Sequence, residues 1–447
     1  MAEYISDHAV VLGGSIAGLL AARVLADAYA RVTVVDRDVL TGTEGPRRSI
    51  PQGRQIHGLQ PRGQEILEDL FPGFTDEMAA HGAQIQDTVN QGHWYFRGRL
   101  LRKAPSDLVT VAASRPLLEA RIRDRVLKLP EVSFLEEHDI IGLTTTPDRG
   151  RVTGARVHPR ASGGAVREIP ADLIVDATGR GTRTPLWLAG FGYPDVEEER
   201  LEIGVGYATR HYRLPPGTRH DGRATIVIAS PEDPRGAICA EVEGGRIQLA
   251  VNGILGDFPP TDPDGFERYV KSLPVPALYE LTQEAEPLDD PVAHRFPVSL
   301  RRRYEKMARF PDRLLVTGDS VCSFNPVYAQ GMTVAALGAM VLRRHLRAGH
   351  APQPLPYLSD LAREAVSPSW EANAVNDLQF AGVRGERTLK TRMIQAYGRL
   401  VQAAAAHDPD VAHAFVRVLS LADPGTALMS PAVLLRVLRH RTAGVGR

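Results

Sequence analysis

The sequence predicts an α/β protein with a Rossmann-like parallel-sheet domain, an inserted antiparallel sheet and a helical C-terminal region. A strand, Gly-rich turn, helix and second strand occupy residues 9–36, and alternating apolar runs separated by Pro and Gly fill residues 192–294. Helical periodicity dominates the chain from about residue 361. The length of 447 residues is compatible with about three structural units.

The composition is that of a folded protein and excludes several function classes. Lys+Arg and Asp+Glu are both 53, so no global charge recruits nucleic acid or an anionic membrane. The two cysteines, Cys239 and Cys322, have no partner at metal-ligand spacing, which argues against a metal site and a disulfide framework. No signal peptide or long apolar segment is visible. We therefore expect a cytoplasmic protein with no metal, no nucleic-acid partner and no stable membrane anchor.

The N-terminal unit has the pattern of a dinucleotide site. An apolar run at residues 9–12 leads into GGSIAG, a helical segment follows, and a β-branched run ends at Asp36. Gly13 permits the tight turn, the small Ser15 lets the backbone approach a pyrophosphate, and Gly18 allows close packing of helix and strand. Asp36 is placed to accept hydrogen bonds from a ribose. The alternative is an α/β turn that binds no nucleotide.

Two later segments have a similar pattern, in which a predicted strand ends close to an acidic residue and glycines. Residues 171–176 end at Asp176 and continue as ATGRGTR, and residues 314–316 lead into Gly318 and Asp319 before a helix over 332–346. Ligands of open α/β sheets bind at the carboxyl ends of strands. We therefore expect Gly13, Asp176 and Asp319 to meet at one crevice if the three strands share a sheet.

The remaining chain divides around this predicted sheet. The alternating runs between residues 192 and 294 predict an antiparallel meander of about four or more strands. The expected organisation is a discontinuous cofactor domain (residues 1–75, 100–190 and 295–350), a β-sheet substrate domain (76–99 and 191–294) and a helical C-terminal domain (351–447).

Taken together, these motifs resemble the class A FAD-dependent monooxygenases of the para-hydroxybenzoate hydroxylase type, whose FAD-binding domain is of the glutathione-reductase type. The strings PQGRQIHGLQPRG, ILEDLFPGF, LIVDATGRGTR and SFNPVYAQGMTVAAL resemble the branch containing the polyether polyketide epoxidases of monensin and lasalocid biosynthesis, which are similar to squalene epoxidase. The resemblance runs over most of the chain, including WEANAVNDLQF.

The resemblance implies FAD as cofactor and a set of residues that bind it. It places the pyrophosphate against Gly13, Ser15 and Gly18, and the adenosine against Asp36 and Arg37. It places the ribitol and its phosphates against Arg47, Arg115 and Asp319. The flavin ring would lie against Gln330, Gly331 and Met332. Asp176 departs from the usual DG-based motif of aromatic hydroxylases, and Ala329 stands where the branch has Gly. The helix that starts near Met332 directs its partial positive end toward a reduced flavin.

The implied reaction uses NADPH or NADH and O2 through a C4a-hydroperoxyflavin, which transfers one oxygen to a small apolar organic substrate. No second dinucleotide fingerprint is present, and the isolated tryptophans do not form the WxWxIP motif of flavin halogenases.

Ring hydroxylation benefits from a base, whereas an isolated alkene needs none. The weak candidates for such a base are His57, Tyr207, His211 and Tyr212, and the candidate pocket residues are Trp94 and Trp187.

The leading hypothesis is an epoxidase acting on a polyketide or terpenoid alkene in natural product biosynthesis. An aromatic polyketide hydroxylase of the same superfamily is the second reading. A flavin reductase resembling geranylgeranyl reductase is the third, and a non-catalytic nucleotide-binding protein is the fourth.

Overall fold

The first strand of the chain lies at the centre of a five-stranded parallel sheet. The computed structural model describes residues 4–161, 164–215 and 224–443. The strand order is β21 (Leu314–Val316), β12 (Leu173–Asp176), β1 (Ser6–Leu12), β2 (Tyr29–Val35) and β8 (Val132–Leu135). Its neighbouring strands all pair in parallel. Strand β1 precedes Gly13, β12 precedes the ATGRGTR segment and β21 precedes Asp319. These three strands are adjacent in the sheet, as the sequence predicts.

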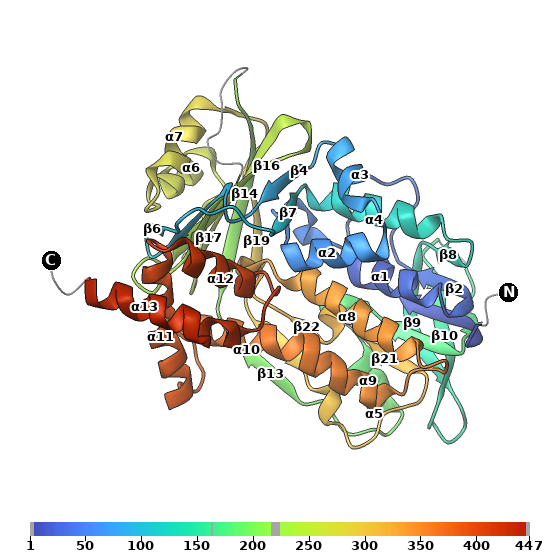
Figure 1. Cartoon of the computed structure of the whole chain (residues 1–447). Helices are drawn as coiled ribbons and strands as arrows, with labels where there is room; N and C mark the ends of the chain where they lie inside the picture. Colours follow the sequence, from blue (N-terminus) through green and yellow to red (C-terminus); the bar gives the residue numbers. More distant parts are fainter. Residues whose placement is uncertain (1–3, 162–163, 216–223, 444–447) are drawn as a thin grey trace.

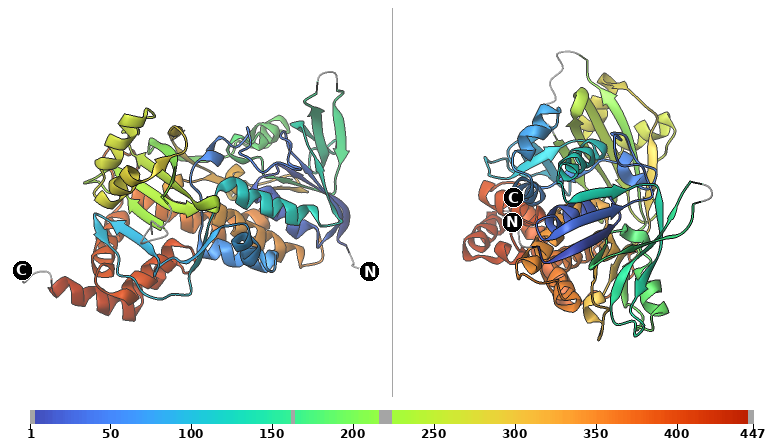
Figure 2. Two further views of the ribbon diagram at one scale, coloured as in Figure 1. Left: turned by 90° about the horizontal axis from the view of Figure 1, so that it is seen from above. Right: turned by 90° about the vertical axis from the view of Figure 1, so that its right-hand side faces the viewer.

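Helices and a second small sheet bury the central strands. Helix α1 (Ile16–Leu25) packs against α8 (Gly331–Leu346), and both join a core with α2 (Pro61–Leu70), α4 (Arg115–Leu127), α5 (Thr184–Gly190) and α9 (Pro354–Leu361). The antiparallel strands β9 (His138–Thr145), β10 (Val152–Pro159) and β11 (Arg167–Pro170) share this core and form the extension seen in Figure 2. The continuous apolar runs of β1 and β12 match burial on both faces.

A mostly antiparallel sheet forms the second lobe. Its order is β18 (Glu286–Pro287), β14 (Val205–Arg213), β17 (Arg246–Gly253), β16 (Arg235–Val242), β15 (Ala224–Ile228), β5 (Gly92–Phe96) and β6 (Arg99–Leu100), and β19 (Val292–Phe296) also pairs with β14. The expected meander is wrong in one respect, because β14 pairs with β17 and not with β15. Ten positions separate Arg213 from Ala224, which is longer than a two- to five-residue hairpin loop, so sequence order does not impose that pairing.

Short strands and helices connect the two lobes. One three-stranded sheet joins β13 (Glu198–Leu201), β20 (Ser299–Arg302) and β22 (Cys322–Ser323), and another joins β3 (Gly58–Leu59), β7 (Val109–Ala112) and β4 (Gln84–Asp87). Helix α3 (Phe74–Ala80) precedes β4. Helices α6 (Pro263–Lys271) and α7 (Pro276–Glu284) cover one face of the large sheet (Figure 1).

The C-terminal region is helical, as the periodicity predicts. It contains α10 (Ser367–Asp377), α11 (Leu389–Ala405), α12 (Pro409–Leu419) and α13 (Pro431–Ala443). Helices α11 to α13 pack against β5, where the Phe96 and Phe415 rings meet edge to face at 5.0 Å. Figure 1 shows these helices beside the large sheet, at the opposite end of the molecule from the N-terminus. Within the described ranges, none of the helices has the length and apolarity needed to cross a membrane.

Candidate functional site

The turn between β1 and α1 has space for glycine alone at two positions. Gly13 has a φ of +101°, and a Cβ atom there would lie 2.5 Å from the Ala177 carbonyl oxygen. A Cβ on Gly18 would lie 1.8 Å from the Gly13 carbonyl oxygen. Ser15 is the N-cap residue of α1, but its side chain makes no capping hydrogen bond. The first N–H groups of the helix are therefore available to an anionic ligand.

A buried cluster of alternating charges lies behind this turn. Asp36 accepts a 2.7 Å hydrogen bond from the Gly14 N–H, and its Oδ2 lies 3.3 Å from Arg47 Nη1. Arg47 Nη2 lies 2.7 Å from Glu119 Oε1, and Arg115 Nη2 lies 3.1 Å from Glu119 Oε2. The hydroxyl of Ser15 donates to Glu119 at 3.0 Å. The structure thus brings together four predicted site residues around a carboxylate that the sequence analysis did not identify.

Glu119 stays ionised because of its two arginine neighbours. Burial favours the neutral acid, but Arg115 and Arg47 hold the pKa of Glu119 below its ordinary value. Its position four residues after Arg115 on α4 was the available signal in the sequence, since such residues share a helix face.

Arg37 does not join this cluster. Its guanidinium lies 3.4 Å from Asp139 on β9, and its side chain is 57% exposed. The structure therefore gives Arg37 a surface ion pair, and its predicted contact with adenosine stays a prediction.

The carboxylate of Asp176 holds a loop together. It is fully buried and accepts hydrogen bonds from the Thr178 N–H at 2.8 Å, from the Thr184 hydroxyl at 2.5 Å and from the Thr182 hydroxyl. Ser320 also donates to it at 3.4 Å. These protein donors surround both oxygens, so Asp176 shapes the crevice, and its predicted contact with the cofactor stays a prediction.

Asp319 faces the crevice itself. It follows β21 at the carboxyl end of the parallel sheet, and its side chain is exposed. Burial raises the pKa of Asp319, while Arg115 and Arg180 oppose the rise. This carboxylate is thus positioned to accept hydrogen bonds from a hydroxylated ligand.

The start of α8 completes the crevice. Gln330 is the N-cap residue, Gly331 begins the helix, and no atom lies within 4 Å of a Cβ built on Gly331. The Met332 side chain packs in the apolar core, so only its backbone can face a ligand. Ala329 has a φ of +51°, the left-handed conformation that glycine adopts without strain. The substitution noted at Ala329 therefore keeps the loop conformation at an energetic cost.

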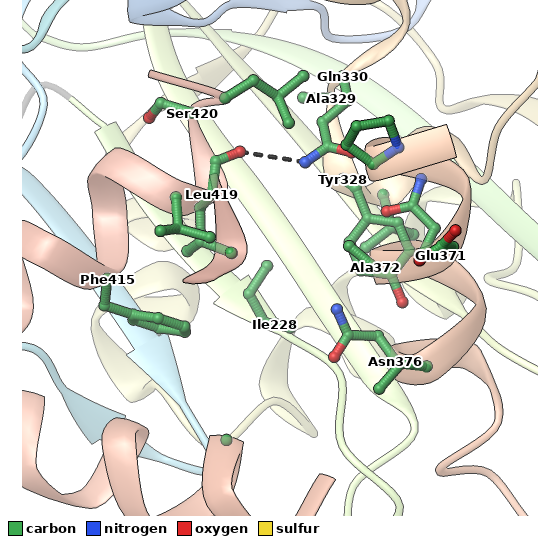
Figure 3. Close-up of a pocket in the computed structure, with 18 of the residues that line it drawn as sticks. Ile228, Tyr328, Ala329, Gln330, Glu371, Ala372, Asn376, Phe415, Leu419 and Ser420 are labelled. Atoms are coloured by element: carbon green, nitrogen blue, oxygen red, sulfur yellow. Dashed lines mark hydrogen bonds between the residues drawn. The ribbon is translucent and has the colours of Figure 1, made fainter. Parts of the chain in front are cut away.

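A cavity of about 1790 Å³ adjoins this end of α8. One wall comes from the large sheet, including Ile228, and the others come from α10, α11 and α12. Figure 3 shows Tyr328, Ala329 and Gln330 at one side of the cavity, with Phe415 and Leu419 on another. The Gln330 side-chain amide donates to the Leu419 carbonyl at 3.1 Å, which joins the loop before α8 to the C-terminal region.

Of the proposed bases, only His57 lines this cavity. Tyr207 is buried in a separate apolar cluster, the Tyr212 hydroxyl donates to Glu267 at 2.8 Å, and His211 Nδ1 lies 2.6 Å from Asp289. Burial, with help from Arg115, lowers the pKa of His57 to about 3. A ring with this pKa is neutral near pH 7 and is a weak proton acceptor. The other three candidates therefore lie away from the cavity, and His57 faces it as a hydrogen-bonding group.

The two candidate pocket tryptophans lie in different parts of the structure. Trp94 lines the cavity and donates its indole N–H to the Thr88 carbonyl at 3.0 Å. Trp187 lies on α5 in the core of the parallel-sheet domain and is not among the cavity residues. Trp187 therefore lies away from this cavity, because its helix packs on the first lobe. Trp370 of α10 lines the cavity in its place, a contact that the chain position alone did not indicate.

Comparison with known proteins identifies the nucleotide site. The profile of the FAD_binding_3 family, described as an FAD binding domain, matches residues 7–353. The chain belongs to this family. It is 35% identical over 455 residues to Protein Rv3254 of Mycobacterium tuberculosis (strain ATCC 25618 / H37Rv), covering 97% of this chain and 94% of that protein. FAD is therefore the cofactor.

Two further likenesses agree with this assignment. Kynurenine 3-monooxygenase of Salinispora arenicola (strain CNS-205) is 26% identical over 360 residues, covering 76% of this chain and 73% of that protein. The structure of the flavin-dependent brominase Bmp2 has a TM-score of 0.68 at 16% identity, with 98% of each chain covered, and shows the common fold. The family and its relatives indicate a flavin-dependent monooxygenase.

The residues present fit FAD. The glycine turn is packed so closely that a Cβ on Gly13 or Gly18 would meet a backbone oxygen at 2.5 or 1.8 Å, and the uncapped start of α1 beside it offers donors to a pyrophosphate. Asp319 offers an acceptor to the ribitol hydroxyls, and the open space before Gly331 can admit a planar ring. The individual contacts remain predictions.

Sequence reasoning missed a second buried group at the same loop. Asp377, the last residue of α10, accepts hydrogen bonds from the Tyr328 hydroxyl at 2.7 Å and from Asn325 Nδ2 at 2.9 Å. Burial raises the pKa of Asp377 to about 6. All three residues lie within strings that carry the family resemblance, but their mutual contact depends on the packing of α10 against the loop.

Proposed function

We propose that the enzyme epoxidises a carbon–carbon double bond of a large apolar natural product, a polyketide or a terpenoid. The observation that carries this proposal is the cavity, whose volume of about 1790 Å³ exceeds the roughly 300–1,000 Å³ typical of sites for drug-sized ligands. Aliphatic and aromatic side chains from the sheet and from α10 to α12 make up much of its wall. A bulky apolar substrate fits such a wall better than a small charged one does.

The acid–base groups of the cavity favour alkene oxidation. Ring hydroxylation benefits from a base that removes a phenolic proton. His57 has a pKa of about 3, and the Tyr328 hydroxyl already donates to Asp377. An isolated alkene requires neither group to remove a proton, so this arrangement suits epoxidation.

The chain contributes binding, orientation and exclusion of water. FAD, when bound, carries electrons from NADPH or NADH to O2 and makes one oxygen atom available for transfer to the substrate. The apolar sheet wall and the C-terminal helices exclude water from the substrate, while the free N–H groups at the start of α8 favour negative charge at that end of the cavity. Asp319 and Arg115 would hold the polar part of FAD at the crevice.

An aromatic polyketide hydroxylase is the second candidate. His57 on the cavity wall favours it, because its Nδ1 lies 2.8 Å from the Gln55 carbonyl and leaves Nε2 as an acceptor for a phenolic hydroxyl. This role orients a phenol without taking its proton.

The test is turnover by the purified holoenzyme with polyenes, terpenes and phenolic polyketides. Nicotinamide oxidation and O2 uptake are followed together, and products are analysed by mass. Substrate-stimulated uptake with an epoxide product supports the proposal, and a phenol supports the hydroxylase. Saturation of an alkene without O2 uptake would instead identify a reductase resembling geranylgeranyl reductase, and oxidised flavin that no nicotinamide reduces would contradict all three activities.

A further inference from the structure

Exposed apolar side chains surround the mouth of the large cavity. Leu389, Met393 and Ile394 of α11 are 76%, 64% and 44% exposed, and Met429 is 62% exposed. All four also line the cavity, so the cavity reaches the surface where they lie. We call these four residues the mouth patch. Helix α13, which packs against α11, also carries the exposed Leu435 and Leu438, which do not line the cavity.

Unpaired cations accompany the mouth patch. Lys390, Arg392 and Arg399 are exposed on α11, and none has an ion-pair partner among the residues that the structure describes. The 17 residues of α11 include no Asp or Glu. A protein whose formal net charge is zero therefore carries a local charge of +3 on the helix beside its cavity mouth.

We propose that the mouth patch and the cations of α11 dock on the surface of an anionic lipid bilayer. Aliphatic and methionine side chains interleaved with Lys and Arg form a surface that inserts shallowly among lipid headgroups while its cations meet the anionic lipids. Protein interfaces instead depend on buried Trp, Tyr and Arg anchors, and the mouth patch has no aromatic side chain. The contact is peripheral and needs no membrane-spanning helix.

Docking there would open the cavity directly to the bilayer. An apolar substrate dissolved in lipid could then enter between α11 and Met429 without crossing water. This role in substrate delivery rests on the proposed function, whereas the docking itself rests on exposure, charge and the position of the cavity mouth.

Sedimentation of the full-length holoenzyme with vesicles tests the docking. Vesicles of phosphatidylcholine alone are compared with vesicles that contain about 30 mol% phosphatidylglycerol, at low salt and at about 0.5 M NaCl. We expect binding to the anionic vesicles at low salt, with weaker binding at high salt and to neutral vesicles. Equal binding to both compositions, or no binding to either, would overturn the proposal.

Two double variants and one matched control locate the contact. Leu389→Ser with Met393→Ser, and Lys390→Glu with Arg392→Glu, should each lower the vesicle partition coefficient by about tenfold or more. The control Leu186→Ser removes a side chain that is 67% exposed on α5 of the other lobe and should bind as the wild type does. Wild-type binding by both double variants would contradict the proposal.

Two other results separate the possible errors. A dimer in analytical ultracentrifugation that the Leu389→Ser, Met393→Ser variant dissociates, with no vesicle binding, would assign the mouth patch to a second copy of this chain. Substrate-stimulated O2 uptake without vesicle binding would overturn the docking alone, and vesicle binding without uptake would overturn only the proposed function.

Discussion

The hydroxyl of Tyr328 donates a 2.7 Å hydrogen bond to Oδ1 of Asp377 and thereby ties the loop before α8 to the end of α10. The same oxygen accepts from Asn325, while Oδ2 is buried without a hydrogen-bond partner in the described structure. A buried carboxylate with one unsatisfied oxygen is costly when ionised. The contact between the cofactor domain and the C-terminal region therefore depends on a titratable group.

The raised pKa of Asp377 makes this contact sensitive to pH. Its folded-state pKa of about 6 lies above the ordinary value of 3.8, so its stabilising contribution is complete below about pH 3.8 and is lost as the pH rises through about 6. Relative to Asp377→Asn, the wild type should lose on the order of 2–3 kcal/mol between about pH 4 and pH 7. Unfolding of the two proteins across this range measures the difference.

An exposed aspartate provides the control. The Asp7 side chain is 77% exposed, so Asp7→Asn should track the wild type at every pH. A pH-independent gap between the wild type and Asp377→Asn would show that Asp377 is protonated equally in the folded and unfolded chains, so that folding does not raise its pKa.

The buried charge cluster predicts a large effect at Arg47. Arg47→Met leaves Glu119 and Asp36 buried without their shared cation, which should destabilise the protein by about 3–5 kcal/mol. Arg37→Met, at an exposed position with one 3.4 Å ion pair, should change stability by less than about 0.5 kcal/mol. Thermal unfolding of the apoproteins compares the two variants.

FAD titration of the same variants measures cofactor binding separately from stability. Arg47→Met should bind FAD more weakly because the cluster supports the turn at Gly14 and Ser15. Equal stability of Arg47→Met and Arg37→Met would contradict the importance of the cluster.

Ala329 offers a stabilising substitution. Its φ of +51° places an L-residue in the left-handed region, which costs roughly 1–2 kcal/mol relative to glycine. Ala329→Gly should therefore stabilise the protein by up to about 1 kcal/mol, after the entropy of the unfolded glycine is included. Ala396→Gly on exposed α11 should have the opposite sign and cost about 1 kcal/mol. Destabilisation by both changes would contradict strain at Ala329.

The sequence was sufficient to predict the crevice because its signals are local. Each of the three strands carries its own apolar run and ends at its own polar turn, so the sequence alone predicts that Gly13 and Asp319 lie at one sheet edge. The role of Asp176 was not predictable, since its partners Thr182, Thr184 and Ser320 depend on how the loops fold back.

The cavity depends on packing between distant segments, which periodicity does not specify. Alternation along β14 shows that Tyr207 and Tyr212 point to opposite faces, but it does not show that α6 and α7 cover the face of Tyr212. Helical periodicity in the tail predicts α10 to α12 without indicating that they form the other walls of the cavity. The base candidates on the sheet therefore lie outside the cavity, whereas His57 lines it.

His57 supplies a pH prediction opposite in sign to that of Asp377. Its pKa in the folded protein is about 3, below the ordinary 6.5, so its stabilising contribution is present above about pH 6.5 and is lost as the pH falls toward 3. Relative to His57→Gln, the wild type should lose about 2 kcal/mol between about pH 7 and pH 5. His350→Gln, at an exposed position, should show no such trend. If the gap between the wild type and His57→Gln stays constant over this range, His57 is protonated equally in the folded and unfolded chains, and its assignment as a neutral hydrogen-bonding group of the cavity is wrong.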